Sequence, residues 1–163
     1  MATTLNPLLI PGSVVQVVQS SYPTLSTFTV GIPVDDTIPQ ISEGTELLTA
    51  SITPKSSTSL LDIHAVIPAT QGSANSNIGI ALFRDSTLSA LSANSWANSG
   101  TGARGTVMSL RVQVVSGSTA STTFRIRIGP EVSGGTITVN GVSGARIFGG
   151  VQAATLTITE IAA

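Results

Sequence analysis

The sequence predicts an all-β protein, an antiparallel β-sandwich in the form of a jelly roll with about nine strands. Apolar or alternating runs of strand length recur at roughly 10- to 15-residue spacing, and Gly, Pro, Asn and Ser separate them. Thr, Val and Ile, which suit pleated and half-buried surfaces, are abundant. No stretch has convincing helical periodicity. These three observations together indicate the sandwich class.

The clearest strand pattern lies in the first half of the chain. Residues 46–53 alternate between two faces, and residues 60–67 form a second apolar run of strand length. Residues 54–58, rich in Ser and Thr after a proline, turn the chain between them. Pro33 and Pro39 keep the preceding segment out of any helix or central strand. The pattern predicts two antiparallel strands joined by a short connection.

The second half holds further strands with distinct faces. Residues 77–84 are apolar or small on both faces, so this strand is expected to be buried on both sides. In residues 121–128, Arg125 and Arg127 point away from the apolar face, and Arg111 takes the same outward side of the preceding strand. Three arginines are therefore predicted on one face of a hairpin, either simply solvated or facing a subunit or ligand. The remaining predicted strands are residues 14–19, 25–30, 106–115, 135–140 and 154–161.

Residues 85–104 are predicted to be the longest non-strand region, because Ser and Asn are too dense there for a confident helix. Trp96, the only tryptophan, lies in this region. It either packs the loop against the sandwich or, with Asn94 and Asn98, binds a receptor glycan or protein. Loops on a β-scaffold commonly carry binding residues, and aromatic and amide groups suit sugars.

The predicted domain organisation is an extended N-terminal arm, residues 1–13, followed by a single jelly-roll domain, residues 14–163. Proline and glycine keep the arm extended or turned. Its apolar side chains are the candidates for binding another protein, although the arm could equally pack along the edge of its own domain. These side chains are Leu5, Leu8, Leu9 and Ile10.

Composition excludes several function classes. Charged residues make up only 9% of the chain, against roughly one quarter in ordinary domains, which suggests that other subunits cover much of the surface. The net charge of −1 and the lack of a basic tract argue against nucleic-acid binding and against anionic membranes. Without cysteine there is no disulfide, thiolate zinc site or thiol nucleophile. We find no signal peptide and no apolar run that could insert into a membrane.

Candidate chemical motifs are weak. Residues 100–105 match G-x-G-x-x-G, but a strand rather than a helix is predicted to follow, so a dinucleotide site is not expected. His64 is the only histidine and shares a strand face with Asp62. This pair could begin a catalytic triad, yet serine is too abundant for a third member to be recognised. We therefore expect no enzyme, no catalytic residues and no cofactor.

The one acidic cluster lies in residues 35–46. It contains Asp35, Asp36, Glu43 and Glu46, and calcium near Asp35 and Asp36 is conceivable because hard cations need several oxygens. The spacing matches no calcium loop, and Asp before a proline-rich turn is ordinary turn chemistry. No metal ligands are assigned.

Several short segments, in one order along nearly the whole chain after the arm, resemble a family of small bacteriophage virion proteins of the tail-fibre or structural type. The segments are VVQVV at residues 14–18, IPVDDTIPQISEGTE at 32–46, SITPKSSTSLLDI at 51–63, ALFRD at 81–85, FRIRIGP at 124–130, ITVNG at 137–141, and FGG with LTITEI within 148–161. In organisation the modules are similar to the trimeric jelly-roll knobs of tumour necrosis factor and complement C1q, an analogy of fold only.

The resemblance implies a non-enzymatic virion surface protein, made in the host cytoplasm and assembled as a homotrimer with other virion proteins. Because the chain has no shaft, heptads or collagen-like repeat, we expect a head decoration (cement) protein that binds and stabilises the capsid, with the arm holding the major capsid protein. The alternative is a tail-fibre or tail-tip knob that binds tail proteins and a host receptor.

Overall fold

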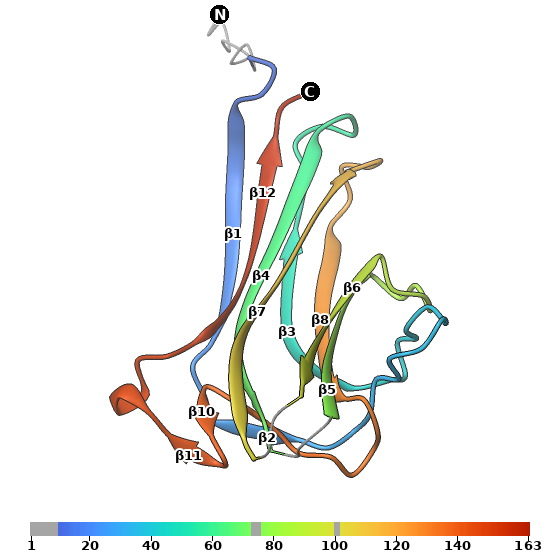
Figure 1. Cartoon of the computed structure of the whole chain (residues 1–163). Helices are drawn as coiled ribbons and strands as arrows, with labels where there is room; N and C mark the ends of the chain where they lie inside the picture. Colours follow the sequence, from blue (N-terminus) through green and yellow to red (C-terminus); the bar gives the residue numbers. More distant parts are fainter. Residues whose placement is uncertain (1–9, 73–75, 100–101) are drawn as a thin grey trace, which may run out of the picture.

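The computed structural model describes residues 10–72, 76–99 and 102–163, and it is all-β, as predicted. Its strands form two stacked antiparallel sheets (Figure 1). Within the described residues there is no helix with the length and apolar character to span a bilayer. The elements are β1 (Val14–Tyr22), β2 (Ser26–Phe28), β3 (Thr45–Ile52), β4 (Leu60–Gln71), β5 (Ser76–Arg84), β6 (Ser92–Asn98), β7 (Arg104–Val115), β8 (Thr122–Pro130), β9 (Ile137–Val139), β10 (Gly141–Val142), β11 (Ala145–Arg146), the 3-10 turn η1 (Phe148–Gly150) and β12 (Ala154–Ile161).

We name the two layers sheet A and sheet B. In sheet A, the long strand β4 pairs with β7 along one edge, and with β12 and then β9 along the other. β1 lies outside β12, and β2 lies outside β9. Sheet B has the order β3-β8-β5-β6, and β10 and β11 form a separate small hairpin. The first and last strands of the chain are therefore neighbours in one sheet.

Two predicted hairpins are wrong. β3 pairs with β8 in sheet B, whereas β4 belongs to sheet A, so the turn between β3 and β4 crosses from one layer to the other. The same holds for β7 and β8. Arg111 consequently lies on the outer face of sheet A, while Arg125 and Arg127 lie on that of sheet B. Local alternation shows which face is apolar, but not which strand is the partner.

The region predicted to lack a strand contains β6, which pairs antiparallel with β5 as the edge of sheet B. Its sequence, SANSWAN, has little strand propensity. Pairing with the buried strand β5 overrides that weak preference. The two-residue strands β10 and β11 were also not predicted.

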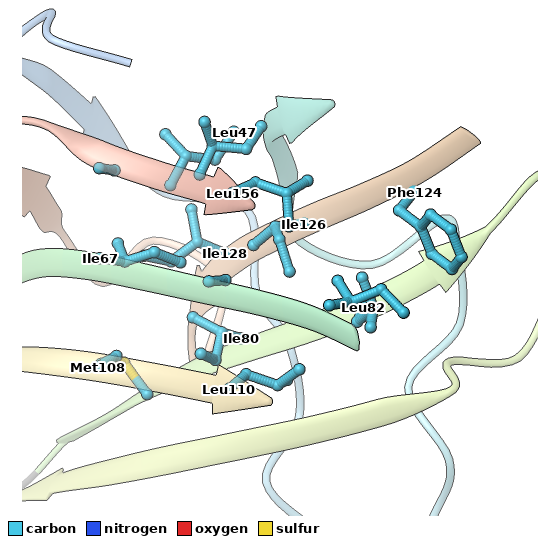
Figure 2. Packing of buried hydrophobic residues seen from close by; sticks show 14 of the residues in the cluster. Leu47, Ile67, Ile80, Leu82, Met108, Leu110, Phe124, Ile126, Ile128 and Leu156 are labelled. Carbon is cyan, nitrogen blue, oxygen red and sulfur yellow. The ribbon is translucent and has the colours of Figure 1, made fainter. Parts of the chain in front are cut away.

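The main core lies between the sheets and is built almost entirely from aliphatic side chains (Figure 2). Leucine and isoleucine from both sheets interdigitate, with Phe124 and Met108 filling the ends of the layer. Residues drawn in the figure include Leu47, Ile67, Ile80, Leu82, Leu110, Ile126, Ile128 and Leu156. This agrees with a chain that contains many Ile and Leu but few aromatic residues.

A second, smaller core covers the outer face of sheet B. Ile32, from the segment between β2 and β3, packs against Ala81 and Phe83 of β5. The two-sided burial predicted for this strand is confirmed by its burial pattern. Gly129 of β8 makes the close approach possible, since a Cβ there would lie 2.3 Å from the carbonyl oxygen of Val30. The strand β5 is thus buried among apolar side chains on both faces of sheet B.

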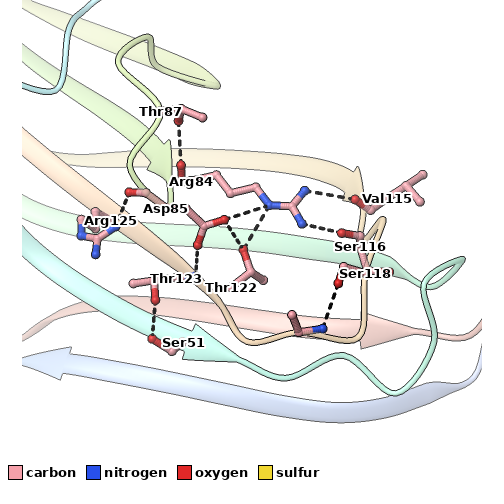
Figure 3. Close-up of polar contacts among 11 residues, drawn as sticks. Ser51, Arg84, Asp85, Thr87, Val115, Ser116, Ser118, Thr122, Thr123 and Arg125 are labelled. Carbon is pink, nitrogen blue, oxygen red and sulfur yellow. Dashed lines mark hydrogen bonds and ion pairs between the residues drawn. The ribbon is translucent and has the colours of Figure 1, made fainter.

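A network of hydrogen bonds and ion pairs lies at one end, or pole, of the sandwich, where β5 ends and β8 begins (Figure 3). The Arg84 guanidinium donates to the carbonyl oxygens of Val115 (3.3 Å) and Ser116, and to the hydroxyl of Thr122 (3.1 Å). Asp85, at φ 53°, accepts from the same hydroxyl at 3.0 Å. Charged donors and acceptors thus satisfy the backbone of the turn that leads from sheet A to sheet B.

A buried carboxylate lies at the same pole. Glu160 of β12 is fully buried and accepts hydrogen bonds from Gln16 (2.6 Å) and from the N–H groups of Lys55 (2.7 Å) and Ser56 (3.3 Å). Burial raises its pKa, but these hydrogen bonds outweigh burial and bring the pKa below the ordinary value. Glu160 therefore fastens the turn between β3 and β4 to sheet A.

Candidate interaction surface

The outward side chains of β1, β12, β4 and β7 form a surface that we call the open face. Unlike the outer face of sheet B, it has no second core over it within the described residues. Val17, Val107 and Val115 are 57%, 62% and 54% exposed. Exposed apolar side chains gathered on one sheet face are typical of an interaction surface.

Strand register arranges the open face in rows. One apolar row runs across all four strands and consists of Val14, Ile161, Leu60 and Val115. The two central rows are mainly polar: the first consists of Val17, Thr159, Asp62 and Gln113, of which only Val17 is apolar, and the second consists of Gln19, Thr157, His64 and Arg111. Toward the other end, Pro68 is paired with Val107. The face thus has a polar middle between two apolar ends.

The polar middle is largely satisfied within the chain. Arg111 donates from Nε to both Asp62 oxygens (2.9 and 3.1 Å) and from an Nη to Oδ2 (2.7 Å). The hydrogen bonds from Arg111 hold the pKa of Asp62 below its ordinary value. Since the Arg111 side chain is 63% exposed, the pair contributes little to folding but can enter an interface already paired.

His64 and Asp62 do lie on one face of a strand, as predicted, but they do not begin a triad. His64 Nε2 lies 3.1 Å from Ser109 Oγ. The Asp62 carboxylate faces Arg111, and no hydrogen bond joins it to His64 among the described contacts. A charge-relay arrangement needs that hydrogen bond to hold the imidazole tautomer.

The predicted arm lies mostly outside the described residues. Leu5, Leu8 and Leu9 fall within the undescribed residues 1–9, so their predicted role in partner binding is not tested. Ile10 is described and is 68% exposed. The residues that follow are fixed to the end of the chain, because Gly12 N–H donates to the Ala162 carbonyl oxygen at 2.8 Å.

The alternative receptor residues lie on β6 rather than on a loop. Trp96 packs against the main core, which confirms that it fastens this region to the sandwich. Asn98 is buried, and Asn94 donates to the Ser109 carbonyl oxygen at 2.9 Å, linking β6 to β7. Their role in receptor binding remains a prediction.

The acidic segment forms a turn. Asp35 Oδ1 accepts from the Thr37 N–H at 2.8 Å, and hydrogen bonds from the Thr37 hydroxyl and N–H lower its pKa. Across the described ranges no three His, Asp or Glu side chains cluster in a way that could hold a metal ion.

Two features lie at the pole of the sandwich opposite the chain ends, and the sequence carries no obvious signal for either. One is the exposed aromatic side chain of Phe148, which is 74% exposed. The other is a cleft between the segments that follow β2 and β8. The exposed valines of the open face likewise carry no obvious sequence signal, because alternation shows which residues share a face but not whether another chain segment covers that face.

Three of the solved structures that resemble the chain are distant from it in sequence. A chain of infectious bursal disease virus, Gx strain, is 16% identical with a TM-score of 0.41, covering 100% of this chain and 42% of that one. A mutant VP2 protein of the same virus, in derived particles, is 16% identical with a TM-score of 0.42, covering 100% and 41%. Latent PorU from Porphyromonas gingivalis is 10% identical with a TM-score of 0.38, covering 94% and 13%. The chain spans less than half of each of these proteins, and such similarities carry no functional argument.

The family match is far more extensive. No curated protein sequence matches the chain significantly. The family model of the Pgp3 C-terminal domain, in contrast, matches residues 27–163, which include every strand of both sheets except β1 and the first residue of β2. The chain therefore belongs to the Pgp3 C-terminal domain family.

Proposed function

We propose that the protein is a non-enzymatic structural protein that associates through its open face into a homotrimer and decorates the surface of a virus particle. The observation that carries this proposal is the open face itself, a broad sheet surface with exposed valines at both ends and an ion pair already satisfied in the middle. Membership of the family named after the Chlamydia virulence-plasmid protein Pgp3 supports a structural role. The bacteriophage origin rests on the motif resemblance, and the head position rests on the lack of a shaft, heptads or collagen-like repeat in the sequence.

Burial of the exposed apolar surface of the open face is expected to drive this association. Burial of apolar surface contributes about 25 cal/mol per Å², and the four-stranded width of the open face offers such surface without leaving an unpaired charge. The low charged fraction of the chain, 9%, reduces the number of charges that association must desolvate. Three copies follow from the similarity in organisation to trimeric jelly-roll knobs, in which closed rotational symmetry limits assembly.

Introducing charge on the open face is expected to dissociate the trimer. Val17→Asp and Val107→Asp each place a carboxylate where association would bury it, and we expect the double variant to be monomeric at micromolar concentration by size-exclusion chromatography with light scattering. Leu88→Asp, on the exposed turn after β5, is the matched control and should remain trimeric. Trimers of unchanged stability in the double variant would contradict the role of the open face, and a monomeric wild type would contradict the trimer.

Attachment to the particle is assigned to the arm. Removing residues 2–9 leaves the described domain complete, so the shortened protein should remain trimeric and folded but no longer co-sediment with particles from which the protein has been stripped. A full-length variant with Leu5, Leu8 and Leu9 changed to Ser separates the loss of apolar contacts from the loss of length. Normal co-sedimentation of both variants would move attachment to another surface.

A further inference from the structure

A turn at the pole opposite the chain ends presents an aromatic side chain to solvent. We call residues 146–151, which begin at the last residue of β11, the tip. Phe148 and Val151 are 74% and 85% exposed. Phe148, Gly149 and Gly150 all have positive φ, at 50°, 62° and 87°. Hydrogen bonds from Gly150 N–H to the Ile147 carbonyl (3.1 Å) and from Val151 N–H to the Phe148 carbonyl (3.3 Å) hold this conformation.

The exposure of Phe148 is exceptional for this chain. The sequence has six aromatic residues. Five of them contribute to the two cores, namely Tyr22, Phe28, Phe83, Trp96 and Phe124. A bulky residue at positive φ is strained by about 1–3 kcal/mol, and such strain persists where the surrounding structure imposes it, most often at functional positions. Aromatic side chains, phenylalanine included, are also enriched in protein interfaces.

A cleft elsewhere at the same pole has complementary chemistry. It has a volume of about 530 Å³, and we call it the acidic cleft. Its apolar walls include Val30 and Val132, which are 47% and 68% exposed, and Pro33. Glu43 and Glu131 supply its acidic rim. Neither of these two carboxylates forms an ion pair among the described residues.

The tip carries the groups that fit this cleft. Phe148 and Val151 offer apolar surface for its walls, and Arg146 offers a cation for its rim. Arg146 lies against the backbone of the tip, since a Cβ on Gly150 would lie 3.0 Å from its Cδ. Among the described residues Arg146 also has no ion-pair partner. Apolar character and charge are therefore matched between two surfaces of one molecule.

The two surfaces are too far apart on the base to meet within one chain. Figure 1 shows η1 and β11 on the left of the base, and the segment that follows β8 on the right. A contact between different patches on identical chains is head-to-tail, and such contacts close into rings when the rotation permits. The tip also adjoins the lower end of the open face, because Ile147 and Val107 line one shared cleft. The contact would therefore continue the interface proposed above.

We propose that the tip of one protomer inserts into the acidic cleft of the next, with Phe148 against Val30 and Val132, and with Arg146 beside Glu131. This inference rests on the proposed self-association and names the residues that fix its direction. The contact makes each protomer both donor of a tip and acceptor of one. A closed ring of copies satisfies every tip and every cleft.

The test is a charge exchange measured by the protomer concentration at half assembly, obtained from light scattering or native mass spectrometry of a dilution series. Arg146→Glu and Glu131→Arg should each raise that concentration on the order of tenfold, because each places like charges together. The double variant, R146E with E131R, should return to within about threefold of wild type, since the reversed pair attracts again. Phe148→Ser should raise it by tenfold or more without rescue.

Controls separate this inference from the function proposed above. Lys55→Glu, which changes the net charge as Arg146→Glu does but lies at the other pole, should leave assembly unchanged. If Val17→Asp with Val107→Asp dissociates the trimer while all tip and cleft variants assemble as wild type, the tip contact is overturned and the open face stands. If wild type is monomeric, both fall. If wild type but not Phe148→Ser co-sediments with phosphatidylglycerol–phosphatidylcholine vesicles, and assembly is unchanged, the tip binds membranes and the proposal is overturned.

Discussion

Replacing Gly129 with alanine is expected to lower the free energy of unfolding by about 2–4 kcal/mol. The added Cβ would lie 2.3 Å from the Val30 carbonyl oxygen and 3.0 Å from Ile32 N, both of which are backbone atoms. They cannot move freely, because Ile32 N–H donates to the Pro130 carbonyl oxygen at 2.8 Å. The segment must lift from sheet B, which exposes the second core around Phe83. Urea unfolding followed by circular dichroism measures the change.

Gly105→Ala is the matched control for this substitution. The nearest atoms to its Cβ would be Thr70 Oγ1 at 3.4 Å and the Ala69 carbonyl oxygen at 3.7 Å, which are ordinary contacts. Its effect should therefore stay within about 1 kcal/mol of zero. Equal effects of the two substitutions would show that the segment after β2 is not held against β8 as described.

Glu160→Gln is expected to cost about 2–4 kcal/mol at pH 7, because it removes a buried charge whose acceptor oxygens satisfy several donors. The amide keeps the shape of the side chain, but its NH₂ group meets donors such as the N–H of Lys55 and the amide of Gln16. Thermal unfolding and urea unfolding should agree on the loss. Glu46→Gln, which alters only a partly exposed pair with Arg125 at 3.5 Å, should cost at most about 1 kcal/mol.

The same substitution predicts a pH dependence. The pKa of Glu160 is lower in the folded protein than its ordinary value of 4.5. Its ionised form therefore stabilises the fold fully above about pH 5, and this contribution disappears as the pH falls through the folded pKa. The stability difference between wild type and Glu160→Gln should be constant from pH 6 to 8 and shrink below about pH 4.5. A difference independent of pH would mean that Glu160 acts through packing alone.

Much of the fold could be predicted from the sequence because period-two alternation is a local signal. All nine predicted strands overlap observed ones, and the apolar face predicted for residues 121–128 is the buried face of β8. Pairing could not be predicted, because the apolar faces of β3 and β4 are equally suited to one sheet or to two facing sheets. β6 was missed since SANSWAN becomes a strand only beside β5.

The candidate site was harder to predict. Asp62 and His64 were correctly placed on one face, but the partner of Asp62 is Arg111 on a strand 49 residues away in sequence, which no local pattern reveals. Trp96 is a candidate binding residue in the sequence because it is the only tryptophan. In the structure its side chain packs against the main core. Phe148 lies in a short turn where periodicity says nothing about exposure.

The position of β12 between β1 and β4 has a consequence for how the protein folds. Residues 14–22 and 60–66 are joined in this sheet only by residues 154–161, which come much later in the sequence than either. Sheet A therefore stays divided until residues 154–161 are available to pair, because β12 is the only partner strand of β1 within the described residues. Closing so long a loop is entropically slow, so folding belongs to the millisecond-to-second range typical of sandwiches rather than to the microsecond range of local folds. The valines of β1 therefore lack their partner strand in every folding intermediate that precedes the pairing of β12, and such intermediates are the ones expected to aggregate.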